Sequence, residues 1–221
     1  MSSTGNDIVA LDTINIARTL QSRFYTKILS AAEIAQYHES GLTQMPFERY
    51  VWMLWSIKES AFKFLQRYEP KLVFSPTKFI VTQLDIPFKN GISPTEGSGF
   101  EDSPACKGIV TMGSNILYSR SLMNEKYIFS VVNDKNDFEN IHWGIKSIHG
   151  AEPDRQSAEV RRFVMNKINK LLPYDDLSIA KNQHGCPILL SSTQQTDISV
   201  SLAHHGHYIG YSFSTGNCLA Y

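Results

Sequence analysis

Glu59 and Lys63 are an acidic and a basic residue that could take part in catalysis or ligand binding. They stand four positions apart in a segment without glycine or proline, so on a helix their side chains project from the same face. This spacing most often indicates a solvent-exposed ion pair between the two side chains. Trp55 and Phe62 lie close by, however, and a carboxylate and an ammonium held against apolar side chains cost free energy unless a ligand uses their charges.

Asp7 is the natural partner for such a ligand site, because it stands inside a short apolar strand where a carboxylate is otherwise costly. Mg²⁺ takes few protein carboxylates, retains water and completes its shell with phosphate oxygens. Asp7 and Glu59 are therefore predicted to bind Mg²⁺, with Lys63 neutralising a phosphate. Asp12 competes as a ligand, but its position favours an N-cap for a helix over residues 13–22.

A second polar group lies towards the C-terminus. The stretch from His184 to Pro187 is typical of a turn, and histidines follow at His204, His205 and His207. A solvated loop is their ordinary meaning. Zinc is the alternative, but adjacent histidines at a strand end point in opposite directions, and no acidic or thiol partner stands beside them. The pattern therefore does not favour zinc.

Two motifs of the first half together resemble those of the 4′-phosphopantetheinyl transferase superfamily. They are G-N-D-I-V at residues 5–9 and W-x-x-K-E-S-x-x-K at residues 55–63, and residues 27–33 resemble the family segment between them. The resemblance implies that the aspartate and the helix glutamate bind Mg²⁺ with the pyrophosphate of coenzyme A. It also implies that Lys63 contacts phosphate, and it places Lys58 among the ligand-binding residues.

The C-terminal group resembles the two coenzyme A motifs of the same family. By this resemblance Gly185 and Pro187 form a coenzyme A-binding turn, and His204 contacts the 3′-phosphate. A predicted helix before them resembles the arginine-bearing helix of the family, whose guanidinium groups suit phosphate. The sequence leaves open which arginine faces the site; the candidates are Arg155, Arg161 and Arg162.

The chain departs from the family pattern at particular positions. Cys186 replaces the basic residue of the Gly-basic-Pro turn, and Ala203 replaces a hydroxyl residue before the histidine. Lys181 is predicted to supply the missing charge. Val9 stands where the larger enzymes of the family have a second acidic residue, so a water is expected to complete that coordination position.

The elements that must position these residues indicate an α+β fold. Apolar periodicity predicts helices over residues 46–68 and 157–172, and runs of strands rather than strand–helix alternation separate them. A surface loop is predicted over residues 90–104, which are rich in glycine, serine and proline. Two similar halves are expected, residues 1–140 with the metal site and residues 141–221 with the coenzyme A motifs.

The order of the motifs is the reverse of that in the larger enzymes of the family. The small trimeric synthases share this order at about half the length. We therefore expect a pseudo-dimer with the active site between its halves, connected as in a circular permutation, and functioning as a monomer. This arrangement predicts that the strand at residues 208–213 pairs antiparallel with the strand at residues 7–11.

Composition excludes several classes of function. Lysine plus arginine equal aspartate plus glutamate at 21 each, so no nucleic-acid or membrane partner is indicated. The three cysteines form no disulfide or zinc pattern, which favours reduced thiols. No signal peptide pattern and no apolar run of about 20 residues is present. A cytoplasmic location is expected.

The reaction implied by the resemblance is attack by a serine of an acyl or peptidyl carrier protein on the β-phosphate of coenzyme A, with release of 3′,5′-ADP. Glu59 is the predicted base, directly or through a bound water. The alternative is a degenerate family member that binds coenzyme A or a carrier protein without transfer. A metal-dependent phosphohydrolase is a third class, but the ligands that such a site needs are missing.

Overall fold

The computed structural model describes residues 3–39, 41–87, 94–101, 103–150, 152–174, 176–192 and 194–215. Its helices are α1 (Ile16–Thr19), α2 (Ser22–Tyr25), α3 (Ala31–Glu39), α4 (Phe47–Leu65) and α5 (Pro153–Leu171). Its strands are β1 (Gly5–Ala10), β2 (Ile80–Asp85), β3 (Glu96–Ser98), β4 (Cys106–Met112), β5 (Asn115–Met123), β6 (Tyr127–Asn133), β7 (Ile141–Ser147), β8 (Leu177–Lys181), β9 (Pro187–Ser191), β10 (Gln194–His205) and β11 (Tyr208–Ser214).

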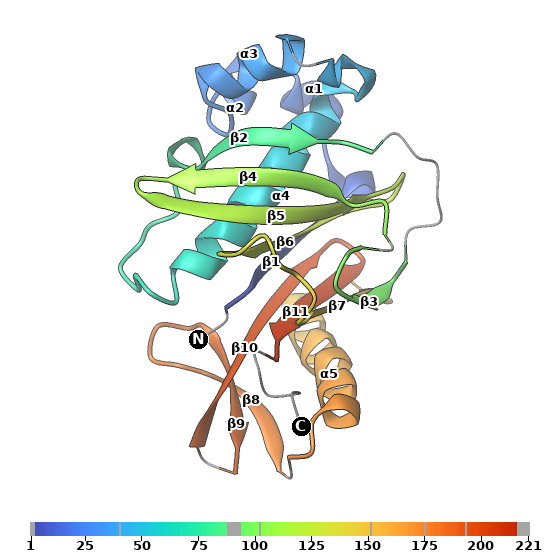
Figure 1. Cartoon of the computed structure of the whole chain (residues 1–221). Helices are drawn as coiled ribbons and strands as arrows, with labels where there is room; N and C mark the ends of the chain where they lie inside the picture. The colour runs from blue at the N-terminus through green and yellow to red at the C-terminus, as the bar shows by residue number, and fades with distance from the viewer. Residues whose placement is uncertain are drawn as a thin grey trace.

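The strands form two antiparallel sheets, and each is packed against one long helix (Figure 1). The first sheet has the order β1-β6-β5-β4-β2, and α4 lies across it. The second has the order β3-β7-β11-β10-β9-β8 and packs against α5. The predicted α+β class is confirmed.

The first core forms between α4 and the first sheet. The apolar face of α4 supplies Val51, Leu54 and Ile57, all fully buried, at the spacing expected of a core-facing helix. β1 lies so close to α4 that a Cβ atom at Gly5 would stand 2.1 Å from the carbonyl oxygen of Ser60. Glycine at this position therefore permits the close approach that brings the next residues of β1 to the helix.

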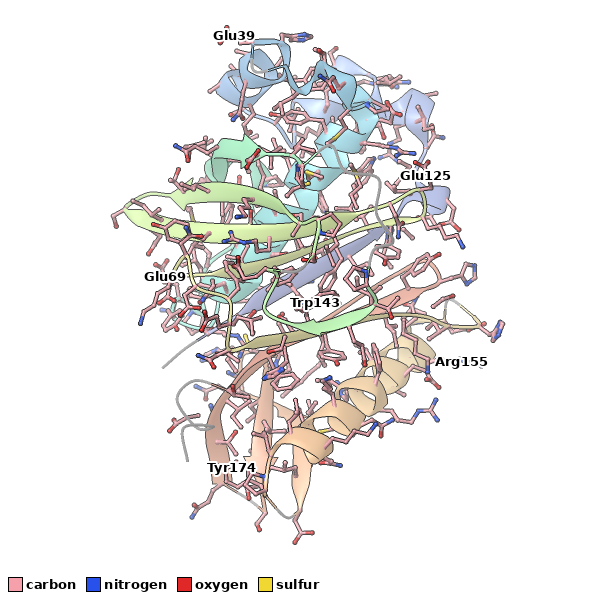
Figure 2. All side chains as sticks on the ribbon, turned by 45° about the vertical axis from the view of Figure 1, so that its right-hand side comes forward. Glu39, Glu69, Glu125, Trp143, Arg155 and Tyr174 are labelled. Atoms are coloured by element: carbon pink, nitrogen blue, oxygen red, sulfur yellow. The ribbon has the colours of Figure 1, made fainter. Side chains whose placement is uncertain are left out.

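The second core forms between α5 and the second sheet, and a third cluster lies where the two sheets meet. Val160, Val164 and Ile168 follow one face of α5 and are buried against β10 and β11. Trp143 is buried at the centre of the third cluster (Figure 2), which also contains Ile8 of β1. The two sheets therefore share a packed apolar contact.

The surface loop predicted over residues 90–104 is partly wrong. Within its described part, β3 pairs with β7, and the Phe100 ring stacks on Trp143 with centroids 5.0 Å apart. The apolar surface of Trp143 holds this glycine-rich segment against the second sheet, although its local sequence favours a loop. Residues 88–93 and 102 lie outside the described residues. The division at residue 140 stays a prediction, although the pairing of β3 assigns that strand to the second sheet.

The predicted pairing of β1 with β11 is wrong. β1 pairs with β6, whereas β11 pairs with β7 and β10, so the two strands belong to different sheets. The permuted connection that required this pairing has no support from the strand register.

Side chains nevertheless join β1 to the second sheet. The Thr4 and Ser212 hydroxyl oxygens are 2.9 Å apart, and the Asn6 N–H donates to the Ser201 hydroxyl at 3.0 Å. The Ala10 N–H donates to Nδ1 of His205 at 2.9 Å. The last two bonds satisfy backbone N–H groups along the free edge of β1, which no strand of the described residues pairs.

The helix predicted over residues 13–22 is also different in the structure. Residues 11–13 form a short 3-10 turn, and the α1 N-cap is Asn15, whose side chain accepts a hydrogen bond from the Arg18 N–H at 2.8 Å. Asp12 is exposed and lies inside the preceding turn, so it does not cap the helix. An asparagine at the actual start of the helix satisfies its free N–H groups instead.

Candidate active site at the contact between the sheets

Lys63 joins the two predicted metal-binding carboxylates. Its Nζ lies 3.0 Å from Oδ1 of Asp7 and 3.3 Å from Oε1 of Glu59. Glu59 and Lys63 are neighbours along α4, whereas Asp7 reaches them from β1. The structure therefore brings together the three residues whose chemistry the sequence singled out, and it makes their group part of the β1–α4 packing.

Burial dominates the electrostatics of this group. It raises the pKa of Asp7 to about 7; Lys63 opposes that rise, and the negative charge of Glu59 adds to it. The two carboxylates outweigh burial at Lys63, so the pKa of its ammonium is raised and it stays charged. Two acidic groups thus share one cation, which leaves a net negative charge when both are ionised.

A pocket of about 240 Å³ opens beside this group, and Lys63 is part of its wall. Most of the residues predicted to bind coenzyme A also line it. They come from α5, from the β8–β9 turn region and from β10: Arg161, Lys181, Gly185, Pro187 and His204. The pocket is therefore built from the end of α4, from α5 and from the second sheet.

The neighbouring histidines His204 and His205 face different parts of the structure. His204 is exposed at the pocket, and burial of part of its ring, followed by the charge of Lys63, lowers its pKa. His205 turns to β1, where its Nδ1 accepts the Ala10 N–H, and burial lowers its pKa as well. His204 is thus available to a ligand, whereas His205 joins the two sheets.

Lys58 does not reach the pocket, and its predicted role as a ligand-binding residue needs correction. Its side chain has 0% exposure, and its Nζ donates to Oε2 of Glu33 at 2.7 Å and to the Ile28 carbonyl at 2.6 Å. Successive helix residues point about 100° apart, so Lys58 faces the core while Glu59 faces the site. Glu33 also accepts the Ser30 N–H of its capping box at 2.7 Å and the Val81 N–H at 2.8 Å. Lys58 therefore ties α4 to α3 and β2.

Arg162 is likewise outside the pocket. Its side chain is 66% exposed and pairs with Glu159, one turn earlier on α5, at 2.6 Å. Arg161 faces the pocket instead, where its guanidinium donates to the Ser157 hydroxyl at 2.8 Å. The tertiary structure thus distinguishes two adjacent arginines that the sequence left equivalent, and it corrects the choice of Arg162.

Ala203 and Cys186 occupy different surroundings. Ala203 is buried in the cluster between the sheets, so a hydroxyl at this position would not line the described pocket. Cys186 lines the pocket, so of these two departures from the family pattern it is the one that changes the pocket wall. Cys106 is also a free thiol, and Cys218 lies outside the described residues.

Sequence reasoning missed Arg67, Gln66, Ser157 and Ser201, which also line the pocket. A signal for Arg67 was present, because it stands four residues after Lys63, in the turn that follows the same helix. Ser157 similarly precedes Arg161 by four positions. The position of Ser201 depended on which face of β10 meets β1, which only the packing decides.

Asp7 and Glu59 fit a Mg²⁺ ion by the chemistry of their donors. Both offer oxygen ligands, both already share the cation of Lys63, and Mg²⁺ requires only one or two carboxylates when water and phosphate complete its shell. Within the described part of the chain, no group of three or more His, Cys, Asp or Glu side chains could hold a metal ion. Substrate phosphate would have to supply the remaining charge.

No helix in the described ranges is long and apolar enough to cross a membrane. A search of curated proteins found no match, and neither did a search of solved structures. A family model matches residues 3–96, and its description is 4′-phosphopantetheinyl transferase superfamily. The matched range contains both first-half motifs, so the resemblance predicted from the sequence is confirmed. By this match, residues 3–96 of the chain are similar to the 4′-phosphopantetheinyl transferase superfamily.

Proposed function

We propose that this protein transfers the 4′-phosphopantetheine arm of coenzyme A to a serine of an acyl or peptidyl carrier protein. The serine oxygen forms a bond to the β-phosphorus, the bond from that phosphorus to the bridging oxygen breaks, and 3′,5′-ADP leaves. One observation carries the proposal. Lys63 contacts two carboxylates and also lines a pocket whose described wall contains three further cationic side chains, Arg67, Arg161 and Lys181, and no carboxylate.

The residues of the first sheet and α4 would act on the pyrophosphate. Asp7 and Glu59 would hold Mg²⁺, which when bound neutralises charge that builds up on the pyrophosphate. Glu59, one-quarter exposed, would accept the proton of the serine hydroxyl. Lys63 would turn its ammonium towards the departing phosphate. Phe62 and Trp55 pack against Phe74 beside this group and would limit access of water.

The residues of the second sheet and α5 would hold the nucleotide. His204 would contact the 3′-phosphate, and Arg161 would contribute a planar guanidinium suited to phosphate oxygens. Gly185 and Pro187 would shape the turn beneath it. Because α4, α5 and the second sheet of one chain all contribute to this pocket, we expect the monomer to be the functional unit.

The test is to incubate the protein with coenzyme A, MgCl₂ and an apo carrier protein and to weigh the carrier by mass spectrometry. A gain of one phosphopantetheine arm, lost when EDTA is added, is expected. Coenzyme A binding by calorimetry without any mass gain, across several carriers, would favour a degenerate member. Cys186 at the basic position is the feature that favours this second candidate. Release of 3′,5′-ADP from coenzyme A with an unmodified carrier would indicate hydrolysis.

A further inference from the structure

Arg67 is a partly buried cation at the point where α4 meets the second sheet. Its guanidinium donates to the Pro187 carbonyl at 3.2 Å and to the Val200 carbonyl. Its Nε is buried and has no hydrogen-bond partner in the structure as described. A guanidinium has five N–H donors in a planar fork, so these two carbonyls fix its position and leave other donors unused.

The charge of Arg67 has no described acidic partner. Both of its described hydrogen bonds go to backbone carbonyls rather than to a carboxylate. No carboxylate lines the described part of the pocket wall that Arg67 shares with Lys63, Arg161 and Lys181. Burial lowers its pKa, and only the Cys186 thiol and the Tyr68 hydroxyl oppose this. A desolvated cation without a counter-ion is costly, so the position is explained best if an anion enters the pocket.

Arg67 and Cys186 lie next to each other in the wall of this pocket. Arg67 contacts the carbonyl of the residue that follows Cys186, and the Cys186 Sγ lies 3.9 Å from Oε1 of Gln66. A lysine or arginine at position 186 would place a second cation beside the Arg67 guanidinium, where both would be desolvated and repel each other. A small neutral residue at position 186 is therefore compatible with Arg67, and a basic one is not.

We propose that Arg67 binds the 3′-phosphate of coenzyme A and replaces the basic residue that the turn lacks at Cys186. This inference rests on the proposed function and names a residue that the sequence did not. Lys181, which the sequence suggested for this charge, is exposed. Its flexible ammonium remains largely hydrated, whereas the guanidinium of Arg67 is already held in place by two carbonyls.

The test compares binding of coenzyme A and 3′-dephospho-coenzyme A to the full chain by calorimetry. The wild type should bind coenzyme A more tightly. Arg67→Met should weaken coenzyme A binding about tenfold or more and change dephospho-coenzyme A binding little, because a charge-assisted contact to the 3′-phosphate is lost. The double variant R67M/C186K should recover most of the preference, because it returns a cation to the same place.

The matched control is Arg49→Met. Arg49 lies in the first turn of α4, about 24 Å along the helix axis from the last helical residue, Leu65, at 1.5 Å per residue, and pairs with Glu125. It should leave the preference for the 3′-phosphate unchanged. Melting temperatures show whether each variant folds. If Arg67→Met is unfolded, R67K keeps a donor for the carbonyls and should retain only part of the preference.

The outcomes separate this inference from the proposed function. If the wild type binds neither ligand, the proposed function fails. If the wild type prefers coenzyme A but Arg67→Met weakens both ligands equally, Arg67 is only structural and the inference is overturned. The same holds if Lys181→Met alone removes the preference, or if R67M/C186K behaves like Arg67→Met.

Discussion

Glu59 has two tasks in the proposed reaction, and one substitution removes both. Glu59→Gln keeps the shape of the side chain but removes its charge, so it weakens metal binding and cannot accept the serine proton. We expect the rate of carrier modification at saturating Mg²⁺ to fall by ~10²-fold or more, with the fold intact. Glu48→Gln, in the first turn of the same helix, is the control and should keep the wild-type rate. Near-normal turnover of the Glu59 variant would remove it from the mechanism.

Lys58 shows the opposite case of a motif residue that supports the fold. Lys58→Met leaves the Glu33 carboxylate fully buried without its ammonium partner, and loss of one partner from such a pair typically costs about 3–5 kcal/mol. We expect urea unfolding to show a loss of this size, and K58M/E33Q to recover part of it. A folded Lys58→Met with unchanged stability and weakened coenzyme A binding would return Lys58 to the ligand site.

At the scale of elements, His142 makes the pairing of β7 with β11 sensitive to acid. Its ring stacks on Phe213 at 4.8 Å between centroids, and neither ring nitrogen has a hydrogen-bond partner among the residues described. Burial lowers the pKa of His142, with a smaller effect from Lys167. Below the ordinary histidine pKa of about 6.5, the imidazole is protonated in the unfolded chain but stays neutral in the native state. The free energy of unfolding therefore falls as the pH falls.

His142→Phe should remove this contribution while roughly preserving the volume and the stacking. We expect the melting temperature of the wild type to fall more steeply than that of His142→Phe between pH 7.5 and pH 5.5. The difference between the two curves isolates His142, because the other titrating groups are common to both proteins. Parallel curves would show that His142 has the same pKa in the native and unfolded states, and would contradict its buried position.

At the scale of the whole molecule, the two sheets are joined by a packed cluster and by side-chain bonds along the free edge of β1. In one of these bonds the Ala10 N–H donates to the imidazole of His205, so a single substitution removes the acceptor. His205→Ala should leave that N–H without a partner and cost about 1–3 kcal/mol in chemical unfolding. His205→Asn offers an acceptor in a similar place and should recover part of the loss.

His207→Ala is the control for this experiment, because His207 is exposed two residues further on. It should change the stability little. An unfolding curve of His205→Ala that matches the wild type would mean that water takes over the Ala10 N–H. In that case the contact between the sheets would rest on the apolar cluster around Trp143 and on the other side-chain bonds to β1.

The features that could be predicted from the sequence alone are local. The periodicity of apolar residues placed α4 and α5, and the spacing of Glu59 and Lys63 put both side chains on one face of α4. The spacing of Ser30 and Glu33 is that of a capping box, and it forms at the start of α3, where the Ser30 N–H bonds to Glu33 at 2.7 Å. Each of these features depends on residues within about one or two turns of each other, so the chain encodes them without reference to the rest of the molecule.

The packing of distant segments determines which surfaces meet. It placed Lys58 in the core and Glu59 at the site, selected Arg161 over Arg162, and brought Arg67 to the turn at Pro187. It also paired β1 with β6 rather than with β11. The orientation of a helix about its axis and the choice of a strand partner depend on contacts between distant segments, whose free energies no local pattern records.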